Sequence, residues 1–270
     1  MNDPRRLEQA NDNAAAFWLG QARAHGWQTH VGDALTAVRC ARTPDDQHRV
    51  LITRSYAEPR LVEAELADLM TVWSTGCFTL EDPYGSLDLT GLGAVRMPVM
   101  PVMVREPGSL GRDGRALPYV WDAPGGGSLT VDEVVDGDAL ADAEHVVVDG
   151  FPQPARQPWK RGEAVPPRLL HDRGCRVWLG RLDGTPAGAC LTYDDGRATG
   201  VYWLATLPSA RGRGVARAVM ETALTAVRPD RPATLVATAA GEPLYRRLGF
   251  TDQGRTCWWT RTAPADRAQP

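Results

Sequence analysis

The segment Arg211 to Ala216 (Arg-Gly-Arg-Gly-Val-Ala) constrains the fold more than any other part of this chain. It follows an apolar run, Val201 to Leu207, and leads into a strongly periodic segment, Val215 to Val227. This order predicts a strand, a glycine-rich turn and a helix. The first N–H groups of a helix have no intrahelical partner, and the helix dipole favours negative charge there. Because Gly212 and Gly214 have no Cβ, the backbone can approach a bulky diphosphate, so the turn predicts an anion site.

Length and composition describe an ordinary globular protein. The 270 residues are 43% hydrophobic and 23% charged, enough for one large domain or two ordinary ones. A net charge of −3 gives no bulk attraction to nucleic acid or to a membrane surface. Met1 to Gln9 is polar, and no run of about 18 apolar residues follows. We therefore expect a soluble, cytoplasmic protein that binds neither membrane nor nucleic acid.

The five cysteines are scattered and form no CxxC pair, which is typical of free thiols in a reducing compartment. No set of His, Cys, Asp and Glu has the spacing of metal ligands, so we expect no metal. A covalent route through Cys175 or Cys190 has no motif to support it. His145 and His171 are single histidines in helical settings, for which we expect structural or solvent-exposed roles.

A Gly/Pro-rich stretch, 107–128, is the predicted boundary between two halves, although Leu117 to Trp121 within it can form a short strand. We assign 1–106 to a first domain, 107–128 to a linker and 129–262 to a second domain. The last residues, 263–270, have the composition of a flexible tail.

The second half has a clear pattern of elements. Asp183-Gly184 between two apolar runs is a strong hairpin signal. Gly150 to Pro166, with four prolines, predicts an irregular loop, and Pro167 to Asp172 a helical turn. We expect strands at 129–135, 175–182, 187–193, 198–207, 234–238 and 250–262, and helices at 138–149, 215–227 and 241–248. The result is a mixed sheet flanked by helices.

The first half contains a weak internal repeat. Leu92 to Arg105 can be laid over Leu248 to Arg261, because both segments have 14 residues, begin with Leu-Gly and end with Arg. Extended backwards without gaps, the alignment places Ser55 to Arg60 on the glycine-rich turn. Ser55 to Arg60 also follows a strand and opens an apolar-periodic helix, but it has no glycine and carries Glu58. We infer a duplicated fold whose first copy has lost its anion site; chance similarity is the competing explanation.

Two blocks of the second half resemble motifs of one family. Leu204 to Ala216 resembles motif A of the GNAT superfamily of acyl-CoA N-acyltransferases, whose pattern is [Q/R]-x-x-G-x-[G/A] after a strand. Ala240 to Phe250 resembles motif B of the same family, with a helix and a strand between the two blocks. The resemblance covers about 129–262 and implies a tandem α/β protein of GNAT-like halves, the N-terminal one degenerate.

The resemblance implies roles for particular residues. The backbone amides of the turn would hold the pyrophosphate of acetyl-CoA, the strand end would bind the pantetheine arm by β-augmentation, and Tyr245 would lie near the thioester sulfur. Thr238 replaces the asparagine that relatives often bond to the pantetheine. The implied binding residues are Leu204, Ala205, Thr206, Arg211, Gly212, Arg213, Gly214, Val215, Ala216 and Thr238.

The implied chemistry is direct transfer of an acetyl group to an amine. Tyr245, with a reference pKa of about 10, can protonate the departing thiolate. Many relatives carry a carboxylate on the motif A strand to deprotonate the amine, but Val201 to Thr206 has no acid. A water chain, or an acid such as Glu133, Asp149 or Glu163, must take that role. The loop 150–166, with Trp159, is expected to form a wall of the acceptor pocket.

Two alternatives remain open from the sequence. One is a different donor: a longer acyl-CoA, a carrier-protein thioester or an aminoacyl-tRNA. The other is a non-catalytic module that binds acyl-CoA, which the missing strand acid favours and the retained Tyr245 disfavours. The near-neutral charge fits a small-molecule amine as acceptor better than a highly charged macromolecular target.

Overall fold

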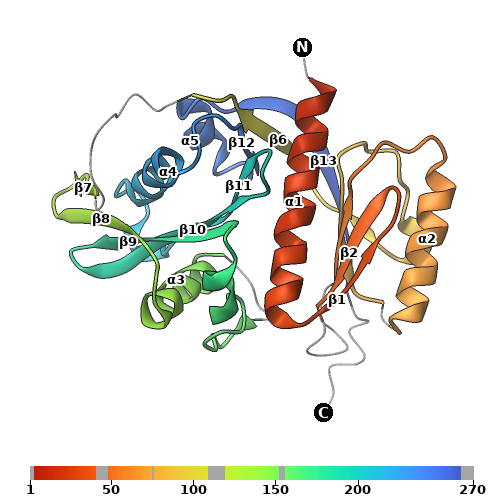
Figure 1. Cartoon of the computed structure of the whole chain (residues 1–270), viewed down its shortest axis with the longest axis horizontal. Helices are drawn as coiled ribbons and strands as arrows, with labels where there is room; N and C mark the ends of the chain where they lie inside the picture. Colours follow the sequence, from red (N-terminus) through yellow and green to blue (C-terminus); the bar gives the residue numbers. More distant parts are fainter. Residues whose placement is uncertain (1–2, 41–47, 75, 109–118, 152–155, 263–270) are drawn as a thin grey trace. The chain divides into compact units, whose positions relative to one another are not determined.

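The computed structural model describes residues 3–40, 48–74, 76–108, 119–151 and 156–262 (Figure 1). By its internal contacts the chain divides into two compact units. Unit 1 comprises 1–103, 236–242 and 251–270, and unit 2 comprises 104–235 and 243–250. The predicted tail at 263–270 and parts of the predicted linker and proline-rich loop lie outside the described residues.

Unit 2 contains an open mixed sheet. Its strands are β7 (Tyr119–Asp122), β8 (Ser128–Glu133), β9 (Cys175–Leu182), β10 (Thr185–Asp194), β11 (Thr199–Thr206) and β12 (Ala233–Val236). They lie in the order β7-β8-β9-β10-β11-β12, antiparallel except for the parallel pair β11 and β12. Helices α3 (Gly137–Gly150) and α4 (Val215–Ala226) pack on this sheet, on opposite sides in Figure 1.

The observed elements of unit 2 agree closely with the sequence predictions. The strand predicted at 175–182 is found within the same bounds, and α4 begins at Val215 as predicted. Asp183 and Gly184 both have positive φ, 50° and 80°, which is the geometry of the tight hairpin turn that this dipeptide predicts. α3 (Gly137–Gly150), a 3-10 helix (Pro167–His171) and α5 (Glu242–Arg247) occupy the other three predicted helical segments. The α/β fold with a mixed sheet is confirmed.

Unit 1 repeats this arrangement with different side chains. Its described elements are α1 (Pro4–His25), β1 (Gln28–Val31), β2 (Leu35–Arg39), β3 (His48–Ile52), α2 (Pro59–Val72), β4 (Phe78–Asp82), a 3-10 helix (Thr90–Leu92), β5 (Val95–Arg96) and β13 (Thr251–Arg261). The sheet order is β1-β2-β3-β4-β13, with β5 added on β13. β6 (Met100–Arg105) extends across the division between the units.

Alternation along β3 assigns the two helices to opposite faces of this sheet. Val50 and Ile52 belong to the core that α2 covers with Val62 and Leu66. The intervening residue, Arg49, lies over the ring of Trp18 on α1. Since successive side chains of a strand point to opposite faces, α1 and α2 cover the two faces, as Figure 1 also shows.

The internal repeat corresponds to a repeated order of elements. In unit 1, α1 is followed by a β-hairpin, a further antiparallel strand β3, helix α2 and the parallel strand β4. In unit 2, α3 is followed by β9, β10, β11, α4 and β12 with the same pairings. Helices α2 and α4 begin 156 residues apart, at Pro59 and Val215, which is the offset of the sequence alignment. The halves are therefore related by topology as well as by sequence.

The last strand of the chain belongs to the sheet of unit 1. β13 pairs antiparallel with β4 and β5, and its Cys257 and Trp259 lie in the core under α2. The sequence interpretation places these residues in the 129–262 domain, because chain order is the only guide that a sequence offers. Strand pairing groups them instead with residues almost 180 positions earlier, such as Leu80, which pairs with Trp259.

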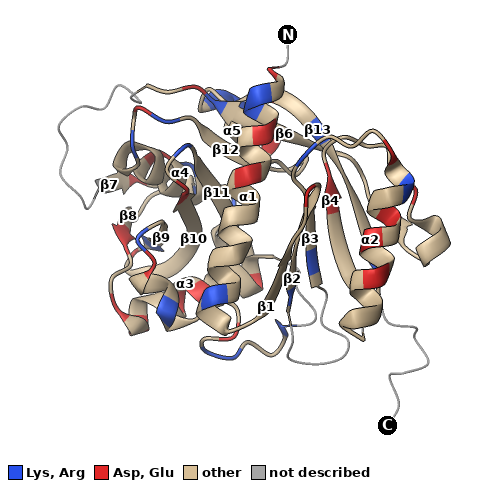
Figure 2. Cartoon of the chain, turned by 45° about the vertical axis from the view of Figure 1, so that its right-hand side comes forward, with Lys and Arg blue, Asp and Glu red and all other residues tan. Residues whose placement is uncertain are grey.

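Charge is mixed over the surface elements. Figure 2 shows acidic and basic residues on the same helices, including α1, rather than gathered by sign. Within the described ranges, no helix is both long and apolar enough to cross a membrane.

The core of unit 1 can be tested with two leucines of α2. Leu66 is 0% exposed and Leu61 is 66% exposed. We expect Leu66→Ala to lower the free energy of unfolding by about 2–5 kcal/mol, because it leaves a cavity. Leu61→Ala is the matched control and should change it by less than about 0.5 kcal/mol. Urea unfolding of both variants checks this; equal losses would contradict the assignment of α2 faces.

Candidate functional site

The central feature of unit 2 is the parting of two parallel strands. β11 and β12 pair only at Thr199 with Ala233 and at Gly200 with Thr234. β11 then continues for six residues, 201–206, that have no ladder partner on β12 in the described structure. β12 therefore does not cover this part of β11, and an extended ligand can lie along it in the manner of an added strand.

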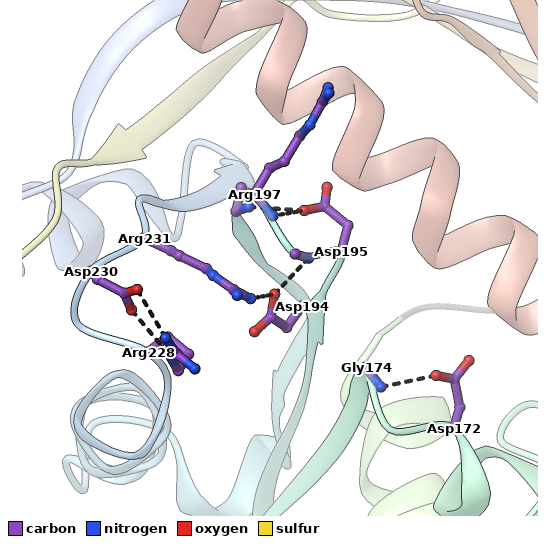
Figure 3. A network of polar contacts seen from close by, with 10 residues as sticks. Asp172, Gly174, Asp194, Asp195, Arg197, Arg228, Asp230 and Arg231 are labelled. Atoms are coloured by element: carbon purple, nitrogen blue, oxygen red, sulfur yellow. Dashed lines mark hydrogen bonds and ion pairs between the residues drawn. The ribbon is translucent and has the colours of Figure 1, made fainter.

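A polar network holds the closed end of this fork together (Figure 3). Arg231, just before β12, forms an ion pair with Asp194 at the end of β10. Asp195 accepts hydrogen bonds from the backbone N–H groups of Arg197 and Ala198, at 2.7 and 2.8 Å, in the turn before β11. The strands are thus fixed where they meet and separate only beyond Gly200.

A β-bulge lies on the open arm of the fork. Ala189 pairs with Ala205 and Leu191 with Tyr202, so Trp203 and Leu204 together face the single residue Cys190. Trp203 has φ 52°, a left-handed conformation that is strained for a bulky residue. A bulge of this kind changes the direction of the backbone N–H and C=O groups beside it. Sequence reasoning missed it, because the strand has no glycine or proline there.

The glycine-rich turn follows directly. Gly212 and Gly214 have φ 76° and 80°, and Gly214 is the N-cap of α4, with no side-chain cap hydrogen bond. A Cβ on Gly214 would lie 3.1 Å from Cδ of Pro124. Glycine is therefore required both by the conformation and by the close approach of the 123–127 turn. The first N–H groups of α4 have no side-chain cap, which is the arrangement that the sequence predicts for an anion site.

The two arginines of the turn do not extend freely into solvent. The guanidinium of Arg213 donates to the carbonyl oxygen of Pro124, at 2.7 Å from Nε, and to that of Gly126. A guanidinium nitrogen of Arg211 donates to the carbonyl oxygen of Gly150 at 3.3 Å. These bonds hold both guanidinium groups against backbone carbonyl groups, and the backbone N–H groups of Arg211 and Arg213 also donate within the turn, to Pro208 and Ala210.

Tyr245 lies beside the bulge. It is 9% exposed, and its ring packs edge-on against Phe250, with the ring centroids 6.0 Å apart. Burial, with a smaller contribution from the nearby Cys190 thiol, raises the pKa of Tyr245 to about 12. Cys190 is the residue that faces Trp203 and Leu204 across the ladder. Tyr245 is therefore a phenol that keeps its proton at neutral pH, near the open arm of β11.

The buried cysteines of unit 2 are poor nucleophiles. Burial raises the pKa of the Cys190 thiol, and burial together with Asp172 raises that of Cys175 to about 12. Because the thiolate is the reactive form, neither residue supplies a nucleophile near neutral pH.

The end of α3 packs against the end of β11. A Cβ on Gly150 would lie 2.8 Å from Cβ of Ala205 and 3.3 Å from the backbone N of Thr206. The Thr206 hydroxyl is buried and has no hydrogen-bond partner within the described residues. A buried hydroxyl without a partner can form a hydrogen bond to a polar ligand. The α3 terminus, the strand end and the glycine turn thus converge within unit 2.

The structure assigns the predicted site residues to two places. Within unit 2 it brings Leu204, Ala205 and Thr206 together with the turn 211–216 and Tyr245. Thr238 lies in a segment of unit 1, between β12 and α5. Its hydroxyl accepts a hydrogen bond from the N–H of Gly241 at 3.3 Å, next to the start of α5.

The three acids that the sequence offered as proton acceptors differ in their surroundings. Glu133, on β8, is bound by the guanidinium of Arg176, at 2.8 Å from Nε. Glu163 lies in the loop after α3, where its carbonyl oxygen accepts from Arg156 at 3.1 Å. Asp149, near the end of α3, accepts a hydrogen bond from Nε2 of Gln157 at 2.9 Å and lies 3.0 Å from Nε2 of His145. In the part of the chain that the structure describes, no group of three or more His, Cys, Asp and Glu residues is arranged to hold a metal.

The corresponding place in unit 1 is closed. β3 and β4 pair at four successive positions, from His48 with Phe78 to Leu51 with Glu81, so they do not fork within the strands. Beyond them, the hydroxyl of Tyr56 donates to the fully buried Asp82 carboxylate at 2.7 Å.

The start of α2 is also unsuited to an anion. Its N-cap is Glu58, and Pro59 at the first helical position has no N–H to donate. The start of α2 therefore has the acidic residue Glu58 and lacks the first N–H donor, whereas the start of α4 has uncapped N–H groups.

The second half of the chain matches a known protein family. A family model described as an acetyltransferase (GNAT) domain matches residues 173–252, which include the fork, the glycine turn and Tyr245. The chain contains a GNAT acetyltransferase domain. Among curated proteins, none matches significantly.

Solved structures extend the likeness to the whole chain. A GCN5-related N-acetyltransferase from Kribbella flavida is 18% identical, with a TM-score of 0.64, over 96% of this chain and 97% of that one. A protein of unknown function from Staphylococcus epidermidis is 14% identical, with a TM-score of 0.59, over 87% and 94%. A tandem GNAT protein from the clavulanic acid biosynthesis pathway is 18% identical, with a TM-score of 0.55, over 85% and 78%. At these identities the likeness establishes the tandem GNAT fold.

Gly214 provides a test of the turn. We expect Gly214→Ala to weaken the binding of coenzyme A at least about tenfold, because strain and the contact with Pro124 together amount to about 1.4 kcal/mol or more. Gly184→Ala is the matched control: its φ is also 80°, but its Cβ would meet nothing within 4 Å. Isothermal titration calorimetry of both variants measures the difference. Similar binding by the two would argue against the turn as the diphosphate site.

Proposed function

We propose that this protein is an N-acetyltransferase that moves the acetyl group of acetyl-CoA directly to an amine of a small molecule. The observation that carries the proposal is the combination of a forked β11–β12 pair, an uncapped glycine turn and a buried, protonated Tyr245 in one unit. A diphosphate suits the turn, an extended pantetheine suits the open edge of β11, and a thioester suits the neighbourhood of Tyr245.

The residues present fit coenzyme A. The amides at the start of α4 match a diphosphate, since Gly214 lets the ligand approach and no side chain caps the helix. The buried hydroxyl of Thr206 and the backbone of Leu204 and Ala205 match the amide groups of a pantetheine arm.

The chemistry follows from these groups. An uncharged amine attacks the thioester carbonyl, and a backbone N–H at the bulge stabilises the oxyanion that forms. The carbon–sulfur bond breaks, and the departing thiolate takes the proton of Tyr245. The proton still carried by the new amide nitrogen then passes to the tyrosine oxygen and restores the phenol. Direct transfer agrees with the raised pKa values of the buried thiols, which disfavour an acetyl-cysteine intermediate.

The acceptor is proposed to be small. Acidic and basic residues are mixed over the described elements, and the net charge is −3. An extended polyanion would need a surface of one sign. The loop 156–166 is held against α3 by the buried Glu144 carboxylate, which accepts hydrogen bonds from the N–H groups of Gly162, Ala164 and Val165. A fixed wall of this kind suits a compact acceptor.

Tyr245→Phe tests the proposed acid. Release of free thiol from acetyl-CoA, followed over a panel of amines, should fall about 10²–10⁴-fold in kcat, while KM for acetyl-CoA stays nearly constant. Because the pKa of Tyr245 is raised to about 12, the acid form persists through neutral and mildly alkaline pH. The rate should therefore show no loss from Tyr245 ionisation until the pH nears 12.

Tyr193→Phe is the control, since Tyr193 pairs with Gly200 at the opposite end of β11. Full activity of Tyr245→Phe would exclude the acid role. A longer acyl-CoA that outperforms acetyl-CoA would favour a different donor, and binding without turnover on any amine would favour a non-catalytic module.

The closed counterpart in unit 1 predicts the stoichiometry. We expect one coenzyme A to bind per chain, because β3 and β4 remain paired and Tyr56 bridges to Asp82. Calorimetry on the wild-type chain gives this number directly. Binding of two equivalents of coenzyme A per chain, one of which is retained in the Gly214→Glu variant, would show a working site in unit 1.

A further inference from the structure

Unit 1 contains a buried charged cluster that the proposed transfer reaction does not use. We propose that this cluster binds a small amino acid, with the guanidinium of Arg49 and the indole N–H of Trp258 binding its carboxylate and Glu81 binding its ammonium group. Arg49, Glu81 and Trp258 all lie in unit 1. None of them belongs to the acetyl-CoA site proposed for unit 2.

Strand pairing places part of the cluster on one face of the sheet. Cys257 and Trp259 belong to the core under α2, so alternation along β13 directs Thr256 and Trp258 to the opposite face. Glu81 on β4 pairs directly with Trp258. Because residues directly opposite each other in a ladder point to the same face, Glu81 also lies on the side away from α2.

Arg49 joins these residues to α1. Its guanidinium carbon Cζ lies 4.6 Å from the ring centroid of Trp18 on α1 and 4.8 Å from that of Trp258 on β13. Its Nε lies 3.4 Å from Oε1 of Glu81. β4 lies between β3 and β13 in the sheet, so the Arg49 side chain extends from β3 across β4. A cation is thus held beside two indole rings and one carboxylate, on the face that α1 covers.

Three buried polar atoms of the cluster have no hydrogen-bond partner among the described residues: Nε of Arg49, Nε1 of Trp258 and Oγ1 of Thr256. Thr256 is only 2% exposed. Buried polar groups in folded proteins are almost always hydrogen-bonded. Since guanidinium and indole N–H groups can only donate, a partner for them has to supply acceptor atoms. The cluster therefore has the properties of a binding site for a molecule that carries oxygen acceptors.

The charges of the cluster favour a molecule that carries both signs. A guanidinium fits a carboxylate, to which it can donate two parallel hydrogen bonds. A carboxylate alone would add a negative charge beside Glu81, and uncompensated charge is costly away from water. Burial already raises the pKa of the Glu81 carboxyl, against the opposing effect of Arg49. An amino acid, with its ammonium group next to its carboxylate, pairs with both residues and adds no net charge.

Solvent reaches the charged pair. The side chains of Arg49 and Glu81 are 16% and 11% exposed, and Trp258 is only partly buried. An opening of this size admits the charged head group of a small molecule but not a protein surface. These residues therefore recognise the α-amino and α-carboxylate groups, which are common to all amino acids.

The test uses the full-length chain and the common L-amino acids, each titrated alone by isothermal titration calorimetry in the absence of coenzyme A. We expect at least one of them to bind. The matched amine, which lacks the carboxylate, and the matched carboxylic acid, which lacks the amine, should each bind at least about tenfold more weakly. Thermal unfolding gives a second readout, because a ligand that binds the folded chain raises its Tm.

Three substitutions assign the binding to the cluster. Arg49→Met should weaken it at least about tenfold, because the carboxylate loses its charged donor. Trp258→Phe keeps an aromatic ring but removes the N–H, and Thr256→Val keeps the shape but removes the hydroxyl; each should weaken binding about threefold or more. Arg54→Met is the matched control and should bind normally, since Arg54 also forms an ion pair in unit 1, with Asp12, but its side chain is 46% exposed.

Trp258→Phe and Thr256→Val remove no charge, so they decide the question if Arg49→Met does not fold. Binding of no amino acid would overturn the proposal and leave a structural ion pair with bound water. Equal binding of the matched carboxylic acid would overturn the role of Glu81 and the amino-acid class. Binding that survives all three substitutions would place the ligand elsewhere and so contradict the site. None of these results depends on turnover of acetyl-CoA, so the proposed transferase function is tested separately.

Discussion

The site in unit 2 depends on where two strands stop pairing. β11 and β12 share only the pairs Thr199–Ala233 and Gly200–Thr234, and the ion pair of Arg231 with Asp194 holds that end closed. Everything proposed for coenzyme A lies beyond it: the open edge of β11, the bulge at Trp203 and the turn that starts α4. Had the ladder continued, β12 would occupy the edge of β11 along which we propose that an extended arm binds.

Unit 1 shows what the same topology does without the fork. Its order of helices and strands matches that of unit 2, but β3 and β4 stay paired over four positions. The hydrogen bond from Tyr56 to Asp82 then joins the segment after β3 to the last residue of β4. Duplication has therefore preserved the architecture in both units, while the ligand-binding features differ through a few local interactions. The strand β13, which pairs with β4 in the sheet of unit 1, comes from the far end of the chain, so this sheet is built from two distant parts of the sequence.

Much of this was predictable from the sequence, because the signals were local. Apolar runs separated by Asp183-Gly184 and by the glycine turn set the strands and helices of unit 2, and the 156-residue offset identified the repeat. The rest depends on distant partners. Nothing in the sequence around Trp203 marks a bulge, since that conformation arises from pairing with β10. The bonds from Arg213 to Pro124 and Gly126 link residues about 90 positions apart, and periodicity carries no information about them.

The buried group that donates a proton in the proposed reaction cannot also be the group that accepts the proton of the amine. Tyr245 is buried, so its pKa rises and it holds its proton as an acid, but for the same reason it cannot remove a proton from an amine. The open strand carries no carboxylate to do so, and a charged group within it would itself have to be desolvated.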